Sequence, residues 1–277
     1  MNESHRHRLA RASLPPAPAS SPASMAPRLP GMHDEGALAH SSLGTFTGIL
    51  AALGRIELRE LLRQMNSIGL RSLAFISVTL GFVGAILVYQ AGLQALRIVP
   101  DTSGVGASYL ELLVRDLAAS VTGLMLATRV GAGIAAEIGS MKVTDQLDAL
   151  RLCRTDPIDY LVAPKVVASL IVTPFLTLFA TAVATLTGAT TGYLSFGINP
   201  SVFLDARFIS WGDVITGVVK SIVFGLVIPI VAGHAGLNAK GGSEGVGNAT
   251  TQAVVGGSLA VIVLGFVIGA IGQLLFG

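Results

Sequence analysis

The chain has 277 residues, of which 52% are hydrophobic and only 12% are charged. Soluble domains carry about 25% charged residues, so this composition excludes an ordinary soluble protein and indicates an integral membrane protein. The formal net charge of +2 is too small to predict binding to nucleic acid. The single cysteine, Cys153, excludes an intrachain disulfide and a cysteine-based metal cluster, and no other metal site is predicted.

The N-terminal part differs in composition from the rest. Residues 1–42 are rich in Pro, Ala, Ser and Arg without apolar periodicity, which predicts a disordered tail ahead of a membrane domain over 43–277. Arginines and serines with few acidic residues are typical of an organelle transit peptide. A plain bacterial extension fits the same composition, so both interpretations stay open.

The segment 49–65 predicts an amphipathic helix, because its leucines gather on one side at helical spacing. Its other side carries a basic stripe with a spacing of four residues: Arg55, Arg59 and Arg63. Such a helix suits the membrane interface, where arginines meet anionic headgroups. A surface helix packed on protein is the alternative.

Five apolar segments follow, each near the roughly 20 residues that a bilayer requires. We therefore expect an all-α membrane protein with five transmembrane helices, an N-terminal interfacial helix and a helix outside the membrane. Lys and Arg are concentrated on the segments that share a side with the tail, which places the N-terminus in the cytoplasm. The expected spans are about 72–96, 107–128, 166–192, 214–236 and 253–276.

A charged, helix-forming segment, about 137–152, separates the second and third expected spans. Charged side chains cannot lie cheaply in hydrocarbon, so this helix is expected outside the membrane, on the cytoplasmic side. Within this segment, Thr144 is predicted to cap the start of a helix that has Leu147 and Leu150 on one face. Chemistry alone leaves two interpretations open: a docking helix for another protein, or a solvated loop helix.

The polar motifs predict no enzyme. The chain has no Gly-x-x-x-x-Gly-Lys-Ser/Thr sequence, so a P-loop for ATP is excluded. The serine-hydrolase pattern at 241–245 lies between two spans, without the strand–turn–helix setting that its chemistry needs. An ion-coupled secondary transporter of a hydrophobic substrate is the alternative function, although it usually requires repeats and mid-membrane ionisable groups, and no clear repeat is present.

Three separated motifs resemble one family. They are ATRVGAGIAAEIGSMKVTDQLDAL (127–150), DPIDYLVAPKVVA (156–168), and KSIVFG (220–225) followed by GGSEGVGNATTQAVV (241–255). In this order they are similar to the MlaE/YrbE permeases, the membrane subunits of MCE-type ABC lipid transporters. The resemblance covers roughly residues 45–277.

The resemblance implies a homodimeric permease that moves phospholipid between the inner membrane and an MCE-domain lipid-binding protein. ATP and Mg²⁺ would bind to a separate ABC ATPase, so no cofactor is expected on this chain. The implied location is the bacterial inner (cytoplasmic) membrane, as a multi-pass protein with a cytoplasmic N-terminus. The chloroplast inner envelope is the alternative.

The resemblance also implies two sets of functional residues. The segment 137–152 would be the coupling helix, which contacts the ATPase through Glu137, Met141, Lys142, Asp145, Gln146, Asp148 and Leu150. The candidates for the lipid cavity are Tyr89, Gln90, Arg115, Asp116 and Lys220.

The residues alone leave the roles of three of these candidates open. Arg115 and Asp116 could neutralise each other in a structural ion pair, or face a lipid headgroup. Lys220 could snorkel to the headgroups, or contact a lipid phosphate inside the cavity.

Overall fold

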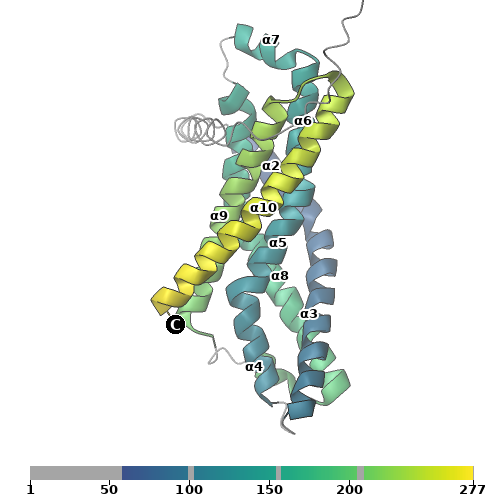
Figure 1. The fold of residues 1–277 in the computed structure, drawn as a ribbon, viewed down its shortest axis with the longest axis vertical. Helices are drawn as coiled ribbons and strands as arrows, with labels where there is room; N and C mark the ends of the chain where they lie inside the picture. Colours follow the sequence, from purple (N-terminus) through teal and green to yellow (C-terminus); the bar gives the residue numbers. More distant parts are fainter. Residues whose placement is uncertain (1–57, 99–102, 154–156, 205–208, 277) are drawn as a thin grey trace, which may run out of the picture. The chain divides into compact units, whose positions relative to one another are not determined.

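The computed structural model describes residues 58–98, 103–153, 157–204 and 209–276 (Figure 1). The chain divides into two units, 1–39 and 40–277, and all described residues belong to the second. The predicted tail and Arg55 therefore lie outside the described residues, as does part of the predicted interfacial helix. In the described part the secondary structure is helical without strands, and five helices are long and apolar enough to cross a membrane. The predicted fold class is thus confirmed.

The first span follows a short amphipathic helix. Helix α2 (Leu58–Ile68) ends at a turn at Gly69, and α3 (Leu70–Ile98) begins at once. In α2, Leu61 and Met65 pack against the core, while Arg59 and Arg63 are exposed. The two described arginines of the basic stripe therefore point away from the protein, as the sequence predicts.

The second span is longer than predicted. Helices α4 (Ser103–Leu112), α5 (Ala118–Leu126) and α6 (Ala132–Val143) follow one another through two π-helical turns, η4 (Leu113–Leu117) and η5 (Ala127–Gly131). The candidate span Ser108–Val143 has 36 residues, which at about 1.5 Å per residue is roughly 54 Å. A hydrocarbon core is only about 30 Å thick, so one end of this helix must project from the membrane.

The segment 137–152 is therefore not one separate helix, which corrects the prediction. Glu137, Met141 and Lys142 belong to the end of α6, and the short helix α7 (Gln146–Leu152) follows a turn at 144–145. Thr144 does not cap the start of α7: it ends α6, and its hydroxyl donates to the Ser140 carbonyl at 2.8 Å.

The third span begins with η6 (Ile158–Val162), which leads into α8 (Ala163–Phe196). After the short η7 (Pro200–Leu204), α9 (Trp211–Leu237) starts with a capping box, in which Ser210 and Asp213 satisfy backbone N–H groups. The last helix, α10 (Gly242–Phe276), begins earlier than the predicted span at 253. Gly241 and Gly242 have φ of 88° and 70°, so the hydrolase-like pattern forms a left-handed turn and the first turn of a helix.

Helices α8 and α9 hold the domain together. Helix α8 packs against α2, α3, α5 and α9, while α10 packs along α9 and α6. The two small residues Gly188 and Gly192 let α8 approach its neighbours, because a Cβ atom there would lie within 3.0 Å of Tyr109 and Phe203 side-chain atoms, respectively. Figure 1 shows that α7 and α4 lie at opposite ends of the domain.

Candidate functional site

The π-helical turn η4 directs two charged side chains toward α9. The Arg115 guanidinium lies 3.7 Å from an Asp213 carboxylate oxygen, and Asp116 forms an ion pair with Lys220. The interpretation that Arg115 and Asp116 neutralise each other is therefore wrong, because each pairs with a residue of α9. The physical reason is that adjacent residues of a helix point in different directions and do not face each other.

A glycine makes this approach possible. Gly217 lies on α9 between the two ion-paired residues of that helix, and a Cβ atom at this position would overlap the carbonyl oxygen of Val114 in η4. The absent side chain thus lets the two backbones come close enough for both ion pairs to form.

The Lys220 ammonium stays inside the protein. Its side chain is only 1% exposed, so it does not snorkel to the end of the helix. A buried charge is costly unless it is paired, and Asp116, whose side chain is 48% exposed, is the partner. On the other side, a Cβ atom on Gly269 of α10 would lie 3.0 Å from the Lys220 Nζ atom, so the small residue lets α10 pass beside the ammonium.

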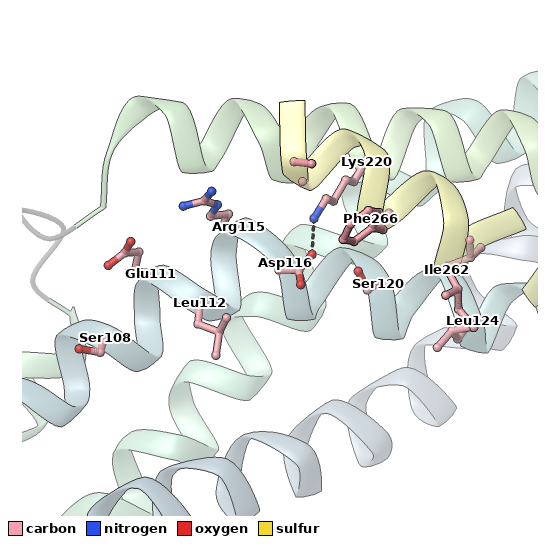
Figure 2. A pocket seen from close by; sticks show the side chains of 14 residues that line it. Ser108, Glu111, Leu112, Arg115, Asp116, Ser120, Leu124, Lys220, Ile262 and Phe266 are labelled. Carbon is pink, nitrogen blue, oxygen red and sulfur yellow. Dashed lines mark hydrogen bonds and ion pairs between the residues drawn. The ribbon is translucent and has the colours of Figure 1, made fainter. Parts of the chain in front are cut away.

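These ion pairs border a cavity of about 650 Å³ between the second span, α9 and α10 (Figure 2). This volume lies within the roughly 300–1,000 Å³ of typical ligand sites. Its polar lining consists of Ser108, Glu111, Arg115, Asp116, Ser120 and Lys220. Its apolar lining includes Leu112, Leu124, Val261, Ile262 and Phe266. The cavity is amphiphilic, with charged side chains next to an apolar wall.

Two of the five predicted cavity residues are elsewhere. Tyr89 and Gln90 lie on α3 and do not line this cavity; the Tyr89 ring instead packs tilted against Phe196, with centroids 5.8 Å apart. The fourth span, α9, lines this cavity instead, through Lys220. Sequence reasoning also missed Asp213, although it lies two helical turns before Lys220 and hence on the same face of α9.

The opposite end of the domain holds the predicted ATPase contacts. Lys142 of α6 forms a 3.9 Å ion pair with Asp148 of α7, and Leu147 anchors α7 with a side chain that is 1% exposed. Asp145 and Gln146 are exposed, whereas Met141 and Leu150 are half-buried.

Glu137 is separate from this group. It lies one to two turns back along α6, where it pairs with the buried Lys165 of α8 at 2.8 Å. The structure therefore brings six of the seven predicted coupling residues together and places Glu137 against another helix.

Comparison with known proteins shows the family to which this chain belongs. Residues 61–271 match the model of the MlaE permease. The chain belongs to the MlaE permease family. It is 41% identical to a probable ABC transporter permease protein of Synechocystis over 215 residues, which cover 77% of this chain and 81% of the relative. A probable ABC transporter permease protein of Rickettsia typhi is 38% identical, covering 77% and 83%.

A plant relative belongs to the same group. The chloroplastic protein TRIGALACTOSYLDIACYLGLYCEROL 1 of Arabidopsis thaliana is 34% identical over 217 residues, which cover 78% of this chain and 62% of that protein. As an MlaE permease, the chain is the permease subunit of an ABC transporter and not itself a catalytic enzyme. Its five apolar helices indicate a multi-pass membrane protein.

Proposed function

We propose that this MlaE permease moves phospholipid, and that the cavity between the second span, α9 and α10 holds the lipid. The observation that carries the proposal is the cavity itself. It has a volume of about 650 Å³ and an apolar wall, and it lies beside two ion pairs in the membrane domain. A membrane phospholipid has the matching chemistry, with a charged headgroup joined to acyl chains.

The charges support a headgroup with a phosphate. Arg115 and Lys220 can donate hydrogen bonds to the oxygens of a phosphate. When no lipid is bound, the carboxylates of Asp213 and Asp116 hold these two cations in place. A phosphate that displaces the half-exposed Asp116 carboxylate would reach the Lys220 ammonium from the cavity side. The acyl chains would lie along Leu124, Ile262 and their neighbours.

The partners follow from the family and from the two ends of the domain. ATP hydrolysis would come from an ABC ATPase that contacts the end of α6 and α7, because this chain has no P-loop. The single helical run from Ser108 to Val143 joins the cavity to that end, so a push on α7 would reach η4 along one helix. A second copy of the chain would close the cavity, and an MCE-domain protein would exchange lipid with it.

The proposed location is the bacterial inner membrane, with the N-terminus and α7 in the cytoplasm. The chloroplast inner envelope stays an alternative, which the chloroplastic Arabidopsis relative favours. That relative is named after a glycerolipid, which agrees with a lipid substrate.

The test uses Gly269→Leu, which fills the cavity beside Lys220 without removing a charge. The matched control is Gly247→Leu in the same helix, where a Cβ atom meets nothing within 4 Å. Purified wild type and control should retain phospholipid, and with the ATPase they should transfer labelled phospholipid between vesicles when ATP is added. Gly269→Leu should lose both properties. Lipid movement that follows an ion gradient without ATPase would refute the proposal in favour of a secondary transporter.

A further inference from the structure

A second polar pocket lies near the opposite end of the domain from the lipid cavity. Its volume is about 180 Å³. It lies where the α2–α3 turn meets η5, α6 and α8. Its polar lining consists of Gln64, Ser67, Arg71, Arg129, Glu137 and Lys165.

The charges of this pocket do not cancel. Lys165 is 4% exposed at its side chain and pairs with Glu137 at 2.8 Å, so this cation and this carboxylate neutralise each other. Arg71 and Arg129 remain, and among the residues that the structure describes neither has a carboxylate within ion-pair distance. The described residues that line the pocket thus carry a formal charge of +2, which an anion would compensate.

The donors of the pocket are also incompletely used. The Lys165 ammonium has three N–H donors, of which Glu137 accepts one and Gln64 accepts another at 3.4 Å. Arg129 has five donors, and in the described residues one goes to the Ser72 hydroxyl. Gln64 is itself held by Glu60 at 2.7 Å, which fixes its amide oxygen toward Lys165. The site is built before any ligand arrives.

The absence of a side chain at Gly133 leaves space in this pocket. Gly133 lines it from α6, and a Cβ atom there would meet nothing within 4 Å. Glycine in a helix interior costs about 1 kcal/mol relative to alanine, and here no neighbouring atom requires the small residue. The space that an alanine or leucine would occupy is left to the pocket.

We propose that this pocket binds a phosphate group, and that the ligand is the headgroup of an anionic phospholipid of the cytoplasmic leaflet. Two arginines and a lysine around one small pocket are the donors that suit phosphate oxygens. The position favours a lipid as the source, because Arg71 lies in the first turn of the first span, beside the amphipathic α2. An apolar groove of about 390 Å³ starts on the same turn, between Met65, Leu73 and Phe175. A lipid bound here would join α2 to α6 and α8.

The experiment measures the thermal stability of the full-length permease in neutral detergent against added dioctanoyl-phosphatidylglycerol. Ligands that bind the folded state raise its melting temperature, so the half-maximal concentration reports affinity. Dioctanoyl-phosphatidylcholine and inorganic phosphate are the comparison ligands. Wild type should be stabilised by phosphatidylglycerol and much less by phosphatidylcholine. Stabilisation by inorganic phosphate at the same concentration would identify free phosphate as the source.

Two variants and their controls assign the effect to this pocket. Gly133→Leu should reduce the shift with phosphatidylglycerol to the level seen with phosphatidylcholine, because the lipid cavity still binds either lipid. Arg71→Gln should raise the half-maximal concentration of phosphatidylglycerol about fivefold, the effect of one juxtamembrane cation. Gly247→Leu and Arg97→Gln, which change the same residue types away from the pocket, should respond like wild type. An unchanged response in Arg71→Gln, or equal shifts with both lipids, would overturn the proposal. A loss of stabilisation in Gly269→Leu instead would assign the lipid to the other cavity.

Discussion

The ion pair between Asp116 and Lys220 should respond very differently to the loss of each partner. Lys220 is 1% exposed, whereas Asp116 is 48% exposed. Asp116→Leu leaves an ammonium buried without a carboxylate, which typically costs about 3–5 kcal/mol. Lys220→Met leaves a carboxylate that can reach the cavity and its water, so we expect a cost near 1 kcal/mol, as for exposed pairs.

The assay is a double-mutant cycle on the free energy of unfolding in mixed micelles. The double variant, Asp116→Leu with Lys220→Met, removes both charges and should be close to wild type, because apolar replacements of buried pairs are often neutral. Since the single variants are expected to cost about 3–5 and about 1 kcal/mol, the coupling between the two sites should then be about 4–6 kcal/mol. Equal costs for the two single variants, or additive costs in the double variant, would refute the reasoning from burial.

Three further variants test other parts of the site. Gly217→Ala should lower the free energy of unfolding by about 1–3 kcal/mol through overpacking against η4. Gly247 has open space around it, so Gly247→Ala should be neutral or stabilising in the same unfolding assay. Arg115→Gln should cost about 1–3 kcal/mol, because it leaves the Asp213 carboxylate, whose side chain is only 9% exposed, without its cation, and it should lower the affinity for labelled phospholipid in equilibrium binding. Lys142→Gln breaks the 3.9 Å pair with Asp148, an exposed contact, so the free energy of unfolding should change by less than about 1 kcal/mol. The amount of ATPase that co-purifies with the permease should fall. An unaffected complex would contradict a coupling role for α7.

The sequence predicts the number and order of the spans well, because hydropathy measures what lies in hydrocarbon. It predicts the helix ends poorly for the same reason. Glu137, Met141 and Lys142 are polar or flexible, yet they are good helix formers, so α6 continues through them beyond the apolar segment. The early start of α10 at Gly242 has the same cause, since a helix that leaves the membrane carries no hydropathy signal there.

The site depends on contacts that no local pattern encodes. The sequence identifies Arg115, Asp116 and Lys220 as charges near apolar segments, but their partners depend on how η4 faces α9. A π-helical turn has no recognised sequence signature here, and it changes the direction of every side chain that follows. Asp213 is also the capping-box residue of α9, so local reasoning has a complete explanation for it without the ion pair.

The two ion pairs between η4 and α9 also constrain how the chain can assemble. Asp213 and Lys220 are two turns apart, or about 10.5 Å along α9, and they have opposite charges. If the second and fourth spans slid past each other by two turns, Arg115 would face Lys220, and like charges would meet in a medium that screens them weakly. We therefore expect these four residues to select one register of the two helices during membrane insertion, before any lipid or ATPase is bound.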